Sequence, residues 1–247
     1  MRRVIGEVQP VQPYTLQYLS EQARRTKETR QFLFGQVDWE AGAVALDLGC
    51  GPGTITEEVC TGHPTGNVVG LDIDWTLLEA GVGRHQHQPR LNLVLADATL
   101  LPFRSSCVAF VLCHFVLMWI SGREAALSEV QRVLQHGGVM AAIEPDYGGR
   151  IEAHATTDTI PRPLSLPIVK WLTDAGANPY IGSQLPAELR RIGLQSIRFG
   201  VLAWEHDPEA AKAETQGEAA LLEAHGIRWS PPDFSFTPIF WLLAKKL

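Results

Sequence analysis

Apolar residues along the chain follow two spacings, and the change between them falls near residue 43. Over residues 14–35 they recur every three to four positions with charges between them, which predicts an amphipathic helix. From residue 43 onward, short continuous apolar runs alternate with stretches of helical spacing, the last of which Gly137 and Gly138 are expected to end. The runs predict strands at 43–48, 67–71, 92–96, 108–114 and 139–144, and the stretches predict helices at 54–62, 75–83 and 122–135. This alternation is typical of a parallel sheet with helices on both faces.

The alternation pauses after Glu144 and returns near residue 183. Residues 145–181 hold a glycine pair and three closely spaced prolines, so we expect an insertion that lies over the sheet. The pattern beyond it predicts helices near 183–192 and 208–225 and strands at 196–203 and 238–244. The long connection before the last strand allows that strand to return antiparallel to the others.

We therefore expect a single α/β domain over residues 1–247. Its centre is a doubly wound, seven-stranded, mostly parallel sheet with an antiparallel last strand. The helix within residues 1–35 is expected to cap the active site, and residues 145–181 are expected to form a helical lid over it.

Composition narrows the classes of partner. The net charge of −6 disfavours a nucleic-acid or anionic-membrane surface, since either needs a basic face. The longest apolar run, residues 107–120, is interrupted by His114 and is too short to span a membrane, and no signal-peptide core follows the first residues. The four cysteines lack C-x-x-C spacing, so we expect neither a zinc site nor a redox pair, and a cytoplasmic protein with free thiols. Glu144 and Asp146 could together bind a metal, but two carboxylates with one residue between them are a weak signal, and we expect no metal.

A glycine-rich stretch, VALDLGCGPGTIT, joins the first predicted strand to a helix. Gly49, Gly51 and Gly53 let the backbone approach a ligand, and the helix start offers free N–H groups. The dinucleotide fingerprint requires a glycine where this chain has Thr54, and Asp47 would repel a pyrophosphate. The loop is better suited to a nucleoside whose other end is positive.

Three acids, Asp47, Asp72 and Asp97, stand at the carboxyl ends of successive predicted strands. Parallel strands bring these ends to one edge of the sheet, so the acids are expected to line one crevice. An acid after the second strand commonly binds a ribose diol, and one after the third can accept a hydrogen bond from an exocyclic amine. Each acid alone can also be a helix cap or a turn residue, but together they favour a site for adenosine with a cationic tail.

These stretches resemble the motifs of class I S-adenosylmethionine-dependent methyltransferases, of the small-molecule type that includes the quinone-biosynthesis enzymes. The resemblance covers about residues 35–145 and rests on DLGCGPG at 47–53, GLDID at 70–74, ADATLLPF at 96–103, CHFVLMWI at 113–120 and RVLQHGGVM at 132–140. It implies a Rossmann-like fold and S-adenosyl-L-methionine as cofactor. The cofactor-binding residues that it and the motif positions suggest are Asp47, Gly49, Cys50, Gly51, Gly53, Asp72, Ile73, Asp97, Ala98, His114, Arg30 and Gln22.

Two of these, Gln22 and Arg30, belong to a polar stripe that repeats every four residues along the N-terminal helix. Either side chain can supply donors to the methionine carboxylate of the cofactor. The alternative is a solvated helix face.

Catalytic candidates lie at the ends of the fourth and fifth strands and in the insertion. His114, Asp146 and His154 are the groups expected to contact or deprotonate an acceptor. The alternatives are a packed histidine at position 114, a turn residue at 146 and a surface residue at 154.

The resemblance implies transfer of a methyl group to a small-molecule acceptor by in-line displacement, in which the protein orients the nucleophile and excludes water. The sequence leaves open whether the nucleophile is oxygen, nitrogen or carbon, and what the oligomeric state is. The alternatives are an NAD(P)-dependent oxidoreductase and a non-catalytic subunit that binds S-adenosylmethionine for a partner.

Overall fold

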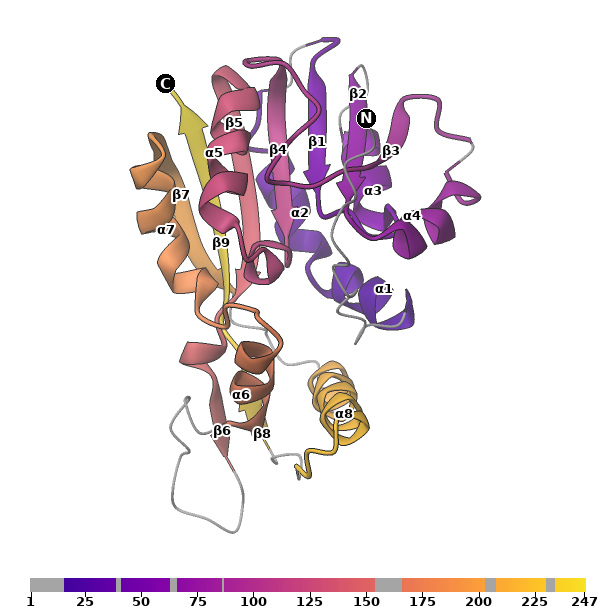
Figure 1. The fold of residues 1–247 in the computed structure, drawn as a ribbon, viewed down its shortest axis with the longest axis vertical. Helices are drawn as coiled ribbons and strands as arrows, with labels where there is room; N and C mark the ends of the chain where they lie inside the picture. Colours follow the sequence, from indigo (N-terminus) through magenta and orange to yellow (C-terminus); the bar gives the residue numbers. More distant parts are fainter. Residues whose placement is uncertain are drawn as a thin grey trace, which may run out of the picture.

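The computed structural model describes residues 16–38, 41–62, 66–85, 87–153, 166–202, 208–229 and 234–247. Within these residues, seven strands form one sheet in the order β3-β2-β1-β4-β5-β9-β7 (Figure 1). The strands are β1 (Val44–Leu48), β2 (Asn67–Asp72), β3 (Leu91–Leu95), β4 (Val108–His114), β5 (Leu134–Pro145), β7 (Leu194–Leu202) and β9 (Ile239–Lys246). Strands β1 to β5 pair in parallel, and β9 is antiparallel to both β5 and β7. The predicted seven-stranded sheet with an antiparallel last strand is confirmed.

Helices cover both faces of the sheet, because successive strand residues point to opposite sides. Ala45 and Phe110 belong to a core cluster with α2 (Lys27–Phe34) and α3 (Thr54–Gly62), whereas Leu46 and Val111 belong to a second cluster with α5 (Arg123–Val133), α6 (Pro167–Asp174) and α7 (Ile181–Arg191). The helices are α1 (Leu16–Arg25), α2 (Lys27–Phe34), α3 (Thr54–Gly62), α4 (Trp75–Val82), α5 (Arg123–Val133), α6 (Pro167–Asp174), α7 (Ile181–Arg191) and α8 (Pro208–Ala224), with short 3-10 turns η1 (Leu117–Trp119) and η2 (Tyr147–Gly149). None of the helices in the described residues is long and apolar enough to cross a membrane.

Two predicted boundaries were wrong. The helix expected over residues 14–35 is broken at Thr26, whose hydroxyl donates to the carbonyl of Gln22 at 3.0 Å and competes with the backbone ladder. The helix expected to reach the glycine pair ends at Val133, and β5 begins at once because Leu134 pairs with Val108. The glycine pair lies inside β5, where the register with β4 shifts.

The segment from 145 to 181 pairs with a later part of the chain. It contains η2, β6 (Ile151–Ala153) and α6, and β6 pairs antiparallel with β8 (Phe234–Phe236), which precedes the last strand. We call β6, α6, α8 and β8 the cap region. Figure 1 shows the cap region and α1 at the end of the sheet to which the parallel strands point. His154 lies outside the described residues.

Candidate functional site

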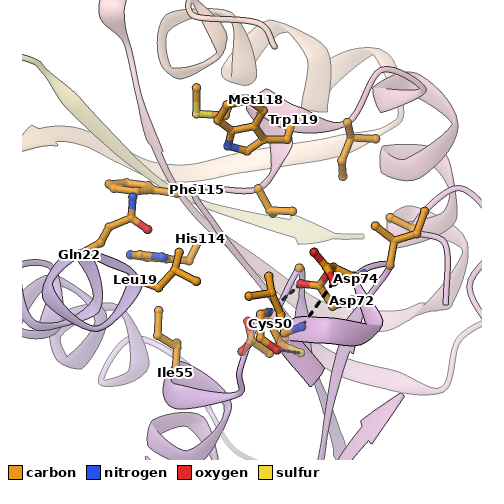
Figure 2. Close-up of a pocket in the computed structure, with 18 of the residues that line it drawn as sticks. Leu19, Gln22, Cys50, Ile55, Asp72, Asp74, His114, Phe115, Met118 and Trp119 are labelled. Carbon is orange, nitrogen blue, oxygen red and sulfur yellow. Dashed lines mark hydrogen bonds between the residues drawn. The ribbon is translucent and has the colours of Figure 1, made fainter. Parts of the chain in front are cut away.

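A cavity of about 420 Å³ lies at the carboxyl ends of the first five strands, a size typical of small-molecule sites. It is closed by α1 on one side and by residues next to the cap region on another. In Figure 2, Cys50 and Asp72 lie along one side of it, Leu19 and Gln22 along a second, and Met118 and Trp119 along a third. This is the edge of the sheet at which the three strand-end acids were expected to meet.

The glycine loop is tied to β2 by its backbone. Gly49 and Cys50 donate their N–H groups to the carbonyl of Leu71, at 2.7 and 3.0 Å, and Gly51 donates to Asp72 Oδ2 at 2.7 Å. Gly49 has φ +71°, and a Cβ added there would lie 2.1 Å from Val116 Cγ2, so only glycine fits. The loop therefore presents backbone rather than side chains to the cavity.

The three predicted acids all line this cavity, but in different environments. Asp72 Oδ1 also accepts the N–H of Asp74 at 2.9 Å, and burial raises the pKa of Asp72. Asp47 is buried and accepts the Thr56 hydroxyl at 2.7 Å, and burial raises its pKa to about 6. Asp97 is exposed, with Oδ1 accepting from both the backbone and the hydroxyl of Thr99 at 2.8 Å. Asp72 and Asp97 thus border the open space, whereas Asp47 supports the loop from beneath.

His114 is the predicted catalytic residue that does line the cavity. Its ring stacks on Phe115, with centroids 4.5 Å apart, and its Nε2 lies 2.7 Å from the Thr26 hydroxyl. The single proton of that hydroxyl is donated to Gln22, so this pattern assigns the proton of the imidazole to Nε2. Burial, together with the charge of Arg30, holds the pKa of His114 well below its usual value, so the ring is neutral.

Arg30 does not line the cavity. It is buried behind His114, where it donates to the Thr26 hydroxyl, to the carbonyl of Ala23 at 2.7 Å and to Glu58 at 2.5 Å. The expected four-residue stripe requires one continuous helix, and the break at Thr26 takes Arg30 off it. The guanidinium supports His114 through Thr26 instead of facing a ligand.

Helix α1 places a different arginine at the cavity. Tyr18, Glu21, Gln22 and Arg25 all line it, and Arg25 Nε donates to Glu21 Oε1 at 3.1 Å. These four positions follow the three- and four-residue spacing of one helix face, a signal that would have identified Arg25 in the sequence. Gln22 was predicted for this place and lies there.

Asp146 is buried but does not line the cavity. Its Oδ1 accepts the N–H of Gly149 at 3.1 Å, and its Oδ2 accepts that of Ser183 at 2.7 Å. The carboxylate therefore ties the turn after β5 to the start of α7, and the expected catalytic position is not supported. A turn residue was the alternative interpretation of the sequence.

A neighbouring acid, Glu144, was considered on the substrate side and as a weak metal-ligand candidate with Asp146, but not among the catalytic residues. It is fully buried, and its Oε1 accepts the N–H groups of Val116 at 3.1 Å and Leu117 at 2.9 Å. Among the described residues, its Oε2 has no hydrogen-bond partner, and burial raises the pKa of Glu144 to about 8. These bonds fix the turn that carries Phe115, which has φ +52°, a costly conformation for a bulky residue.

The predicted residues thus divide into two groups. Those that line the cavity are Gln22, Asp47, Gly49, Cys50, Gly51, Asp72, Ile73, Asp97, Ala98 and His114. Gly53, Arg30 and Asp146 do not, although Gly53 has φ +79° and shapes the loop. In the described part of the chain, no cluster of three or more His, Cys, Asp or Glu side chains is arranged to hold a metal ion.

Comparison with known proteins identifies this arrangement. A family model described as a methyltransferase domain matches residues 46–142, which include most of β1, all of β2 to β4 and most of β5. This match identifies residues 46–142 as a methyltransferase domain. The glycine loop and the three strand-end acids all lie within it.

Two curated relatives of this chain are also methyltransferases. The trans-aconitate 2-methyltransferase of Methylobacterium radiotolerans is 35% identical over 130 residues, 52% of this chain and 48% of that protein. The demethylmenaquinone methyltransferase of Staphylococcus saprophyticus is 32% identical over 120 residues, 48% of this chain and 51% of that protein. The chain spans about half the length of the curated relatives it matches. These relatives support the methyltransferase interpretation and not the oxidoreductase alternative.

Solved structures show the same fold over nearly the whole chain. Geranyl diphosphate C-methyltransferase from Streptomyces coelicolor, in complex with Mg²⁺, geranyl diphosphate and S-adenosyl-L-homocysteine, matches with a TM-score of 0.67 and 16% identity. The match covers 95% of this chain and 84% of that chain. The cap region is therefore part of a known fold. A sequence identity of 16% gives no information about the methyl acceptor of this chain.

Proposed function

We propose that the cavity binds S-adenosyl-L-methionine and that the protein transfers its methyl group to a small-molecule acceptor. The observation that carries this proposal is the meeting of the cavity-lining glycine loop with Asp72 and Asp97 at one cavity. Methyl transfer by the named relatives, and S-adenosyl-L-homocysteine in a structure of the same fold, support it.

The lining residues suit the parts of this cofactor. Asp72 has spare lone pairs on both oxygens for a ribose diol, and Asp97 borders the cavity with Ala98, where an adenine amine and ring nitrogen would bind. Arg25 and Gln22 are the donors we assign to the methionine carboxylate, in place of Arg30. The neutral ring of His114 avoids repelling a positively charged sulfonium nearby.

The cofactor supplies a methyl group already activated on sulfur, so the chain has to orient the acceptor and exclude water. We assign the exclusion of water to two segments, the N-terminal residues 1–35 and the lid in residues 145–181. The cavity contacts of Tyr18 in α1, and of Pro145 and Tyr147 at the start of the lid, support this assignment. His114 is the proposed contact to the reacting groups, and the predicted role of His154 stays a prediction.

We propose a cytoplasmic location and no nucleic-acid partner. The support is the net charge of −6 and four cysteines without a disulfide.

Calorimetric titration with S-adenosylmethionine, and with NADH as control, tests the proposal. Asp72→Asn keeps the shape of the side chain and one acceptor oxygen, and it should weaken S-adenosylmethionine binding by about 2–3 kcal/mol, roughly 30- to 150-fold. Asp174→Asn, in an exposed ion pair on α6, is the matched control and should leave affinity unchanged. NADH binding, or unchanged affinity in Asp72→Asn, would overturn the assignment.

A further inference from the structure

The side of the cavity away from the glycine loop is a wall of apolar and aromatic side chains. We call it the acceptor wall, and its residues are Phe115, Met118, Trp119, Ile120, Pro145, Tyr147 and Ile239. Figure 2 shows Met118 and Trp119 along this side, separated from Asp72 and Cys50. The ring of Trp119 packs edge-on against the buried Trp171, with centroids 6.2 Å apart, which fixes its place. Such a wall favours flat apolar ligands.

The cations near the cavity are already matched by carboxylates. Arg150, just behind the wall, makes a bidentate pair with Glu218 of α8, each bond 2.7 Å long, and both side chains are buried. On α1, Arg25 is paired with Glu21 at 3.1 Å, and the proposed cofactor site already assigns it to the methionine carboxylate. The described acceptor wall itself contains no Lys or Arg. An anionic acceptor would lose its hydration there without gaining a cation.

One polar group in this part of the cavity is oriented by its surroundings. Thr237, buried beside the wall, accepts a hydrogen bond from Arg150 Nη1 at 3.0 Å. A hydroxyl that accepts from a guanidinium keeps its own proton for another acceptor. In the described part of the chain, no acceptor for that proton is found. The Thr237 hydroxyl is thus a donor at the edge of an apolar surface.

From the wall, the matched charges and this donor, we propose that the methyl acceptor is a neutral, largely apolar molecule with a flat ring. The ring lies against Trp119 and Phe115, and one of its oxygen atoms accepts a hydrogen bond from Thr237. This inference rests on the proposed function, since it places the acceptor beside the cofactor site. It favours an acceptor of phenol or quinol type over a carboxylate-rich one.

The test uses two probes of the same size and shape, 2-naphthol and 2-naphthoate, titrated at neutral pH into protein saturated with S-adenosylhomocysteine. We expect 2-naphthol to bind at least about tenfold more tightly, because the carboxylate must be desolvated without a partner. Thr237→Val should weaken 2-naphthol binding about five- to tenfold, and Thr237→Ser should restore it. Trp119→Ala should weaken it more than about tenfold, whereas Trp75→Ala, 56% exposed outside the cavity, should not.

The titration with S-adenosylhomocysteine alone separates the two proposals and reports whether each variant is folded. If S-adenosylhomocysteine binds normally, any of three results would overturn the acceptor inference alone. These are equal or tighter binding of 2-naphthoate, no binding of either probe, and no effect of Thr237→Val. Failure of the wild-type protein to bind S-adenosylhomocysteine would overturn the proposed function and this inference with it.

Discussion

At the scale of single residues, the site is built on carboxyl groups whose burial differs. Asp97 is exposed, Asp72 is partly held by backbone N–H groups, and Asp47 and Glu144 are buried. Sequence reasoning identified three of the four, since a strand-end position is visible in the sequence. It missed the role of Glu144, because that role depends on the turn after β4, which packs over it.

Glu144→Gln tests the protonation of this buried acid. The folded pKa of about 8 lies above the ordinary value of 4.5, so the stability contributed by Glu144 is full below pH 4.5 and is lost as the pH rises through 8. The wild-type unfolding free energy should therefore fall, relative to that of Glu144→Gln, between these values. Asp47 adds a change of the same sign in both proteins, so the difference isolates Glu144.

Urea unfolding at a series of pH values measures this difference, with the exposed Glu124→Gln as control for loss of a surface carboxylate. A constant difference between wild type and Glu144→Gln across the range would show that Glu144 does not change protonation there.

At the scale of elements, the junction of α1 and α2 connects the N-terminal helices to the cavity. The Thr26 hydroxyl is hydrogen-bonded to His114 in β4 and accepts a hydrogen bond from Arg30. Arg30 is in turn paired with Glu58 in α3. Apolar spacing predicted a helix here but not its break, because the break comes from a side-chain hydroxyl competing for a backbone carbonyl. Apolar spacing also failed to predict the start of β5, because that start is set by pairing with β4.

Thr26→Val keeps the side-chain shape and removes the hydroxyl, which leaves His114 Nε2 and one Arg30 N–H without their partner. We expect a loss of about 1–3 kcal/mol in unfolding free energy, and Thr26→Ser should recover most of it. Thr61→Val is the matched control, since the exposed Thr61 hydroxyl also donates to a helix carbonyl, at 3.0 Å, and should change stability by less than about 0.5 kcal/mol. Denaturant unfolding measures all three, and equal effects at positions 26 and 61 would contradict the role given to Thr26.

At the scale of the whole molecule, the buried pair of Arg150 and Glu218 joins α8 to the segment that leads from β5 into β6. Arg150 follows η2, Glu218 lies in α8, and Thr237 precedes β9, so the contact links three distant parts of the chain. The guanidinium also lies over the ring of Trp229, 5.9 Å from its centroid. The part of the cavity lined by the acceptor wall therefore depends on these contacts of Arg150.

Arg150→Met should destabilise the fold by about 3–5 kcal/mol, because it leaves the Glu218 carboxylate buried without its cation. The double variant Arg150→Met with Glu218→Met removes both charges and should recover a large part of this loss. Thermal and urea unfolding of the two variants provide the comparison. A double variant no more stable than Arg150→Met would show that the pair is not the main link.

The sequence by itself determined the order and type of the main elements, the glycine loop and the meeting of Asp47, Asp72 and Asp97. Parallel strands bring their carboxyl ends to one edge, so residues separated in sequence meet by topology alone. Only the tertiary structure placed Arg25 rather than Arg30 at the cavity, showed Asp146 as a turn residue, and put Tyr147 in the acceptor wall with Thr237 beside it. The break at Thr26 decided the first of these outcomes. The others depend on packing between distant segments, which leaves no periodic pattern in the chain.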